Sequence, residues 1–112
     1  MIRHTVAMRY DLGVWASPRP RDDSEAGELF ARLSAGMDRE EADVPTASLA
    51  AFARDLLNRR PDLHVWATAE GIKVGVVPTD GERLDFVVAD IAGMARARGM
   101  VCYDPQRRSR IA

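Results

Sequence analysis

The chain has 112 residues, of which 46% are hydrophobic, so it is long enough to bury one core and too short for two. Its formal net charge of -1 at pH 7 excludes the strong positive potential that draws a protein to nucleic acid or anionic lipid. Its single cysteine, Cys102, excludes an intramolecular disulfide and a cysteine-based metal cluster. We expect a single domain over residues 1–112 in a reducing, cytoplasmic compartment, with no signal peptide and no membrane span.

The first strand is predicted over Arg9–Trp15, because large apolar residues recur there at alternate positions. Two alternatives stay open for the residues before it. Met1–Ala7 is either an upstream extension of a chain that starts at Met8, or part of a longer strand that includes Thr5–Tyr10.

A first helix is predicted to begin at Asp22 or Ser24. Asp22 and Glu25 have the spacing of a capping box, and apolar residues then recur every three or four positions. Gly36 is a natural stop, and Gly27 is a weak point inside the helix. The residues expected on its buried stripe are Ala26, Leu29, Phe30, Leu33 and Met37.

A second helix is predicted after the charged loop Met37–Val44. Pro45 or Thr46 opens it, because proline fits a first helical turn and threonine caps one. It closes before Pro61. The residues expected on its buried stripe are Leu49, Phe52, Ala53, Leu56 and Leu57.

The following segments change from a helical to an alternating apolar period. Leu63–Thr68 is an optional strand that would form a hairpin with Ile72–Val77 through Gly71. Pro78–Gly81 then marks a turn, and the alternation over Leu84–Val88 predicts another strand.

The last elements are predicted from capping and stop signals. Asp90 caps a short helix, and Gly99 ends it in a left-handed conformation. Met100–Tyr103 is the final strand, which Pro105 terminates, and Gln106–Ala112 is a polar, arginine-bearing tail.

These elements predict an α+β domain with one antiparallel sheet of four to five strands and all helices on one face. A ferredoxin-like βαββαβ arrangement, with two helices in the first crossover, satisfies the right-handedness of such connections. It places the first strand in the middle of the sheet, antiparallel to Met100–Tyr103.

Several chemistries lack their motifs in this chain. His4, His64 and Cys102 do not have the spacing of metal ligands, so we predict no metal. No glycine-rich phosphate loop and no Gly-x-Ser-x-Gly nucleophile elbow is present, and we predict no cofactor. No aromatic RNA-binding motif lies on the predicted strands, so we expect no nucleic-acid partner.

Three residues are candidates for catalysis. Cys102 could be a nucleophile if His64 lay close, although burial in the last strand is the favoured alternative. Asp11 and Asp104 could form an acid-base pair, because neighbouring strands carry them. Aspartates at strand ends more often bind the backbone of a turn, and we favour that interpretation.

Three aromatic residues are candidates for binding a partner. Trp15, Trp66 and Tyr103 lie at or near predicted strand ends, where aromatic side chains often form interface hot spots. Core packing is the favoured alternative for the tryptophans. The arginines of the 106–112 tail are expected to be solvated rather than bound to phosphate.

Several stretches of the chain resemble a group of small uncharacterised bacterial proteins that are common in actinobacteria. These stretches are Tyr10–Trp15, Ala51-Phe52 with Leu56-Leu57, Pro61–Leu63 and Gly99–Gln106. The group usually begins with a Tyr-Asp-Leu-x-Val-Trp strand after an early methionine and ends with Gly-Leu-Val-Cys-Tyr-Asp-Pro-Gln. The resemblance covers most of the chain from residue 8 onward and implies no activity and no catalytic residue.

Two classes of function stay open. The preferred one is a non-enzymatic protein-binding module, such as an immunity or accessory protein, because the acidic stretches Asp22–Glu28 and Asp38–Asp43 suit a basic partner. The alternative is a small enzyme or ligand-binding domain with a site around the central strands. A concave polar pocket would favour the second class, and a flat aromatic patch the first. We expect a monomer or a weak homodimer.

Overall fold

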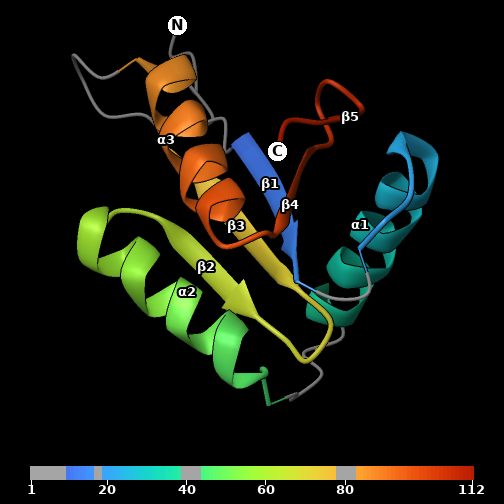
Figure 1. Cartoon of the computed structure of the whole chain (residues 1–112), viewed down its shortest axis with the longest axis horizontal. Helices are drawn as coiled ribbons and strands as arrows, with labels where there is room; N and C mark the ends of the chain where they lie inside the picture. Colours follow the sequence, from blue (N-terminus) through green and yellow to red (C-terminus); the bar gives the residue numbers. More distant parts are fainter. Residues whose placement is uncertain (1–9, 17–18, 39–43, 78–82) are drawn as a thin grey trace, which may run out of the picture.

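The computed structural model describes residues 10–16, 19–38, 44–77 and 83–112. Its strands form one five-stranded sheet in the order β2-β3-β1-β4-β5, and every neighbouring pair is antiparallel (Figure 1). The predicted α+β class is therefore confirmed. The elements are β1 (Tyr10–Trp15), α1 (Asp23–Asp38), α2 (Ala47–Arg59), β2 (His64–Ala67), β3 (Ile72–Val76), α3 (Leu84–Ala97), β4 (Val101–Asp104) and β5 (Ser109–Arg110).

β1 is the central strand of the sheet, and the predicted meeting of the two ends of the chain is confirmed. Gly13 lies opposite Lys73 of β3 on one side and opposite Tyr103 of β4 on the other. Because successive side chains of a strand point to opposite faces, β1 contributes to both faces of the sheet. Leu12 and Val14 are fully buried on one face, and Trp15 is buried on the other.

The helices cover both faces of the sheet, so the prediction of all helices on one face is wrong. α2 and α3 pack on the face that carries Leu12 and Val14, whereas α1 packs on the face that carries Trp15 and Tyr103 (Figure 1). The domain has three layers as a result. The larger core, between the sheet and α2 with α3, includes Leu49, Phe52, Leu56, Ile72, Val74, Val76, Val87, Ile91, Ala95 and Cys102.

Glycines let α1 and the Trp15 ring approach the sheet closely. A Cβ added at Gly13 would lie 2.6 Å from the Trp15 ring and 2.8 Å from the Phe30 ring. One at Gly71 would lie 2.6 Å from Trp15 Nε1, and one at Gly27 would lie 3.0 Å from the Tyr103 hydroxyl. Gly27 therefore permits close packing of α1, and the indole occupies the space that side chains at the other two positions would need.

The prediction of a strand over Leu84–Val88 is wrong, because these residues form the first part of α3. The alternation of Leu84, Phe86 and Val88 does not mark one buried face, because Phe86 is 62% exposed. The buried residues instead follow a helical stripe. The optional strand over Leu63–Thr68 is real and forms β2, which pairs with β3 as a hairpin. The buried residues of α3 are Val87, Val88, Ile91, Ala92 and Ala95.

The helix caps are largely those that the sequence predicts. The Asp22 carboxylate accepts a hydrogen bond from the Glu25 amide at 2.8 Å, and Thr46 Oγ1 accepts one from the Leu49 amide at 3.3 Å. Gly99 ends the α3 segment with a φ of 68°.

Two expected helix signals differ in the structure. Gly36 does not stop α1, which continues to Asp38. Asp90 is not a cap but lies inside α3, where it binds Arg59 and Arg60 and thereby links α3 to the end of α2.

The predicted polar tail, Gln106–Ala112, folds back on the sheet. Ser109–Arg110 forms β5, and the Ile111 amide donates to the Cys102 carbonyl at 2.8 Å. Arg110 also binds the Asp23 carboxylate of α1 at 3.1 Å. The segment is therefore part of the sheet, and its arginines are exposed as expected. The predictions for residues 1–9, for most of the charged loop (39–43) and for the turn at 78–81 fall outside the described residues.

We predict that Gly13→Ala destabilises the protein by about 1–3 kcal/mol, because the new methyl group overpacks the space between Trp15 and Phe30. The matched control is Gly93→Ala, where an added Cβ meets nothing within 4 Å and where alanine favours the helix by up to about 1 kcal/mol. Urea unfolding measures both changes. Equal effects of the two substitutions would show that the close approach at Gly13 is unimportant.

Candidate functional site

The buried carboxylate of Asp104 organises the end of β4. Its Oδ2 accepts a hydrogen bond from the Tyr10 hydroxyl of β1. Its Oδ1 accepts bonds from the Gln106 amide at 3.0 Å, from Gln106 Nε2 at 2.7 Å and from the Arg107 amide at 3.2 Å. A buried charge is costly unless donors surround it, and here donors do. Asp104 therefore binds the backbone of a turn, the role favoured for it from the sequence.

The side chain of Gln106 replaces the backbone of Pro105 in the sheet. The register that places Gly13 opposite Tyr103 brings Asp11 opposite Pro105, which has no N–H to donate. Gln106 Nε2 donates to the Asp11 carbonyl at 2.9 Å, and its Oε1 accepts from the Asp11 amide at 3.0 Å. The Asp-Pro-Gln sequence thus locks the turn between β4 and β5 onto β1.

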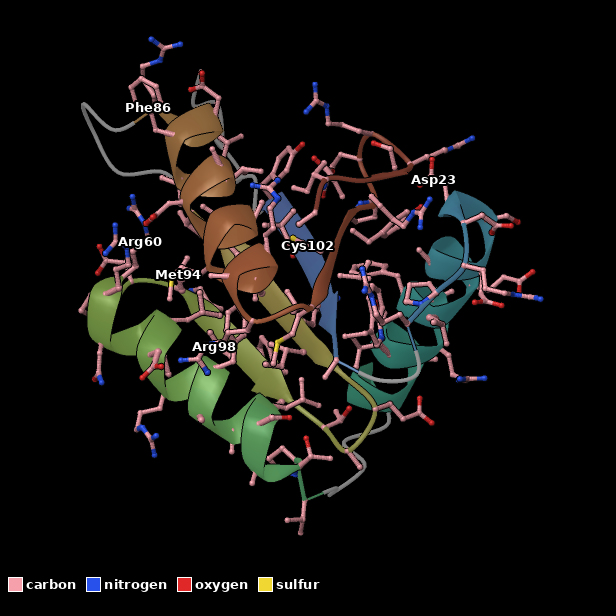
Figure 2. The ribbon with its side chains drawn as sticks, viewed as in Figure 1. Asp23, Arg60, Phe86, Met94, Arg98 and Cys102 are labelled. Carbon is pink, nitrogen blue, oxygen red and sulfur yellow. The ribbon has the colours of Figure 1, made fainter. Side chains whose placement is uncertain are left out.

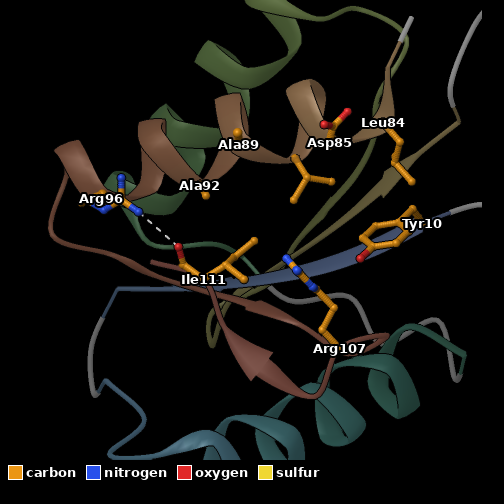
Figure 3. A pocket seen from close by; sticks show the side chains of 9 residues that line it. Tyr10, Leu84, Asp85, Ala89, Ala92, Arg96, Arg107 and Ile111 are labelled. Atoms are coloured by element: carbon orange, nitrogen blue, oxygen red, sulfur yellow. Dashed lines mark hydrogen bonds between the residues drawn. The ribbon is translucent and has the colours of Figure 1, made fainter.

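A groove of about 420 Å³ lies between α3 and this C-terminal hairpin. Figure 3 shows Arg107 and Tyr10 pointing into it from the hairpin and from β1, with Asp85 near one end of α3 and Arg96 near the other. Apolar side chains of α3 and Ile111 form the rest of the surface. We call this the α3 groove, and it is lined by Tyr10, Leu84, Asp85, Val88, Ala89, Ala92, Arg96, Arg107 and Ile111.

The charged side chains of the α3 groove differ in whether they have partners in the protein. Arg96 Nη2 donates to the Ile111 carbonyl at 3.2 Å, which fixes the last residues against α3. Asp85 pairs with Arg83 at 2.8 Å, so its charge is already compensated. The Arg107 guanidinium makes no hydrogen bond or ion pair within residues 10–16, 19–38, 44–77 and 83–112. The groove therefore presents a positively charged donor that an anion could bind.

Tyr10 stays protonated at neutral pH. Burial, and then the hydrogen bond to the Asp104 carboxylate, raise the pKa of Tyr10 to about 12, although the positive charge of Arg107 lowers it. Figure 3 shows the Arg107 side chain beside the Tyr10 ring. The hydroxyl donates its one proton to Asp104, so its oxygen can only accept further hydrogen bonds.

The structure does not unite the predicted catalytic residues. Asp104 and Cys102 lie on the face of the sheet that carries α3, because alternate residues of β4 share a face. Asp11 shares the opposite face with Gly13 and Trp15. The sheet therefore separates Asp11 from Asp104, and the two carboxylates cannot act as an acid-base pair on one substrate.

Cys102 has the environment of a core residue. It is fully buried, and Figure 2 shows it in the interior of the molecule. Burial, with a smaller contribution from the Asp104 charge, raises the pKa of the thiol to about 12. His64, the base considered for it, lies on edge strand β2, and β3 and β1 stand between β2 and β4. The thiol is therefore protonated at neutral pH, and His64 is not beside it to act as the base that a nucleophile needs.

Two of the three predicted binding residues are core residues. Trp15 is 2% exposed and Tyr103 is 5% exposed, and their rings lie 6.4 Å apart beneath α1. Their burial leaves almost no surface for a partner, so the packing role accounts for both. Trp66 differs, because it is 42% exposed on edge strand β2. Phe86 is also exposed and projects from the first turns of α3 (Figure 2).

The sequence interpretation missed the residues that form the α3 groove. Arg107 and Ile111 fell in the expected polar tail, and Leu84 and Val88 fell in a wrongly predicted strand. One available signal was the Asp-Pro-Gln run after β4, which is typical of a turn and not of an unstructured tail. Because the chain turns at this point, residues 109–110 return to the sheet as β5 and Ile111 reaches the groove.

The described residues contain neither a candidate metal site nor a candidate membrane span. In the part of the chain that the structure describes, no three His, Cys, Asp or Glu side chains are grouped so that they could hold a metal ion. None of the helices in that part is both long and apolar enough to cross a membrane. No family model, curated protein or solved structure matches the chain. The function is therefore inferred from the α3 groove and its chemistry.

We predict that Tyr10→Phe changes how stability depends on pH. The pKa of Tyr10 in the folded state is raised above the unfolded value of about 10, so its contribution is complete below pH 10 and is lost as the pH rises toward 12. The variant should be about 1–3 kcal/mol less stable at pH 8, because one oxygen of Asp104 loses its donor. This deficit should shrink above pH 10 in urea unfolding measurements. Cys102 titrates in both proteins and cancels, so parallel pH profiles would contradict the role given to Tyr10.

We predict that the Cys102 thiol of the folded protein reacts with an aromatic disulfide reagent only when the protein opens. Its burial and raised pKa leave almost no accessible thiolate at pH 8. Labelling should therefore accelerate with urea in parallel with unfolding. Complete labelling of the folded protein within the mixing time would restore Cys102 as a candidate nucleophile.

Proposed function

We propose that the protein is a small ligand-binding domain and that the α3 groove is its binding site. One observation carries the proposal. The Arg107 guanidinium, which has no hydrogen bond to the described residues, and the Tyr10 hydroxyl converge beside an apolar surface formed by α3. A concave site with a few convergent polar groups on an apolar surface is the common form of a small-molecule site.

The size and the rigidity of the groove support this proposal. Its volume of about 420 Å³ lies within the range of about 300–1,000 Å³ that is usual for ligand sites. Asp104 and Gln106 fix the turn that carries Arg107, and Arg96 holds Ile111 against α3. A site that is fixed before binding loses less entropy when a ligand arrives.

Binding is favoured over catalysis by the state of the reactive groups. The Cys102 thiol is buried and protonated, and the Asp104 carboxylate is occupied by donors of its own chain. Neither group is placed to accept a proton from a ligand in the groove. The proposal is therefore a binding domain without a chemical step.

A protein-binding module is the second candidate, and one observation favours it. Trp66 is 42% exposed on the edge strand β2, where aromatic side chains can anchor a partner. The acidic stretch Asp22–Glu28 supports it less than expected. Asp22 caps α1, Asp23 binds Arg110, and Glu25 binds Arg21, so these carboxylates already serve the chain's own structure.

The ferredoxin-like assignment is also a proposal. The order β2-β3-β1-β4, with α2 and α3 on one face, is the arrangement expected for that topology and supports it. The position of α1 on the opposite face and the additional strand β5 are departures from it. On this assignment α1 is an insertion in the first crossover.

Blocking the groove tests the proposed function. Ala89→Trp places a large ring on an exposed lining position without changing charge, and Ala50→Trp makes the same change on an exposed position of α2 outside the groove. We predict that hits from a small-molecule fragment library shift the amide NMR signals of Ala92 and Ile111 in the unmodified protein and in Ala50→Trp. The same fragments should lose at least about 1.4 kcal/mol, or tenfold in affinity, in Ala89→Trp. A library without hits on the groove would count against a ligand-binding domain.

The second candidate has its own test. We predict under that hypothesis that a partner captured by the protein is lost with Trp66→Ala and retained with His64→Ala, since both residues lie exposed on β2. The loss expected from removing an aromatic hot spot is about 2 kcal/mol or more. Capture that survives Trp66→Ala would exclude the β2 edge as the protein-binding surface.

A further inference from the structure

We infer that the ligand of the α3 groove is a small amphipathic organic anion. Its carboxylate binds the Arg107 guanidinium, and its apolar body lies along α3. This inference rests on the proposed function and adds the chemical class and the orientation of the ligand. Three features of the groove support it. Asp85 and Arg96 have partners in the protein whereas the Arg107 guanidinium has none among the described residues, the dipole of α3 is positive at one end of the groove, and the central part of the lining is apolar.

The anionic end is assigned to Arg107. The two arginines of the lining differ, because the Arg96 guanidinium binds the Ile111 carbonyl whereas the Arg107 guanidinium has no hydrogen bond to the described residues. A guanidinium donates two parallel N–H groups that match the two oxygens of a carboxylate. Figure 3 shows Arg107 directed into the groove beside the Tyr10 ring. A carboxylate bound there would complete the donor pairs of this side chain.

The dipole of α3 adds to the positive potential of Arg107. Leu84 and Asp85 of the lining belong to the first turn of α3, where the helix dipole is positive. The carboxylate of Asp85 would oppose an anion, but Arg83 pairs with it at 2.8 Å. Arg96 lies in the last turn, where the dipole is negative and where its own charge is balanced. The helix therefore favours the anion at the Arg107 end of the groove.

The body of the ligand is assigned to the apolar surface between these two ends. Val88, Ala89 and Ala92 succeed one another along one side of α3, and Ile111 faces them from the hairpin. Two of the three α3 residues are alanines, which leave room for a chain of methylene groups or a ring. Each methylene group transferred from water to such a surface should strengthen binding by about fourfold.

An amphipathic carboxylate fits this surface better than an inorganic phosphate or a nucleotide. Phosphate sites usually present a row of backbone N–H groups from a glycine-rich loop, and the chain has no such loop. The apolar lining would also stay unused by a compact, strongly hydrated anion. Phosphate is therefore a probe that should bind weakly.

A matched set of probes tests the inference on the full chain. Hexanoate, hexanamide and hexylamine share one body and differ in charge, while acetate keeps the carboxylate and lacks the body. We expect hexanoate to shift the amide NMR signals of Arg107, Ala92 and Ile111 and to bind about tenfold more tightly than hexanamide. Hexylamine should bind more weakly still. Octanoate should exceed hexanoate, and acetate and phosphate should bind least.

Charge variants of the hairpin locate the anionic end. Arg107→Ala should weaken hexanoate binding by about tenfold or more, whereas Arg107→Lys should retain part of it because a lysine keeps the charge without the fork. Arg108→Ala is the control, because it removes a charge from the same turn but not from the groove lining. It should change hexanoate binding by less than about twofold. Circular dichroism establishes that each variant is folded before it is titrated.

The possible outcomes separate this inference from the proposed function. Hexylamine that binds the groove as well as hexanoate, or hexanoate that is indifferent to Arg107→Ala in a folded variant, would overturn the anionic assignment and leave a ligand-binding groove. Acetate as tight as hexanoate would overturn the assignment of the apolar body. If no fragment of any charge reaches the groove, the proposed function itself fails.

Discussion

The buried carboxylate of Asp104 is the interaction on which the C-terminal hairpin and the candidate site depend. Transfer of an ion into a protein interior costs several kcal/mol unless hydrogen bonds replace its water shell. Here the Tyr10 hydroxyl, both nitrogens of Gln106 and the Arg107 amide provide those bonds. The donors come from the first strand and from the turn after the fourth. Satisfying one buried charge therefore joins β1 to the turn after β4.

The same contacts form the candidate site. Asp104 fixes the turn that carries Arg107, which lines the groove beside α3. Asp104 also binds the hydroxyl of Tyr10, whose ring is part of the same lining. The opposite face of the sheet has a different task. There Gly13, Gly71 and Trp15 provide a close-packed surface for α1, and Trp15 and Tyr103, which the sequence marks for binding, are core residues. The candidate groove lies on the other side of the sheet, where α3 packs.

The sequence predicted the elements whose signals are local. The alternation around Leu12 and Val14, the Asp22 and Thr46 caps and the turn at Gly99 were sufficient for β1, α1, α2 and the end of α3. The side of the sheet that a helix covers is not a local property. The stripe of α1 is compatible with either face, and its packing on Trp15 and Tyr103 is a tertiary contact that no local pattern shows. The α3 groove is not predicted for a similar reason. It lies between α3, whose first residues have the alternating pattern of a strand, and a hairpin whose polar composition is typical of a tail.

The central claim is that Asp104 holds the C-terminal hairpin and hence the groove in place, and amide hydrogen exchange in Asp104→Ala tests it most directly. The account predicts that the Arg107 and Ile111 amides lose protection while those of Phe52 and Leu56 in α2 keep theirs, since the larger core does not depend on the carboxylate. Loss of protection confined to the hairpin would establish that one side chain builds the site. Unchanged protection at Arg107 and Ile111 would contradict the account, because the hairpin would then be held by the sheet alone.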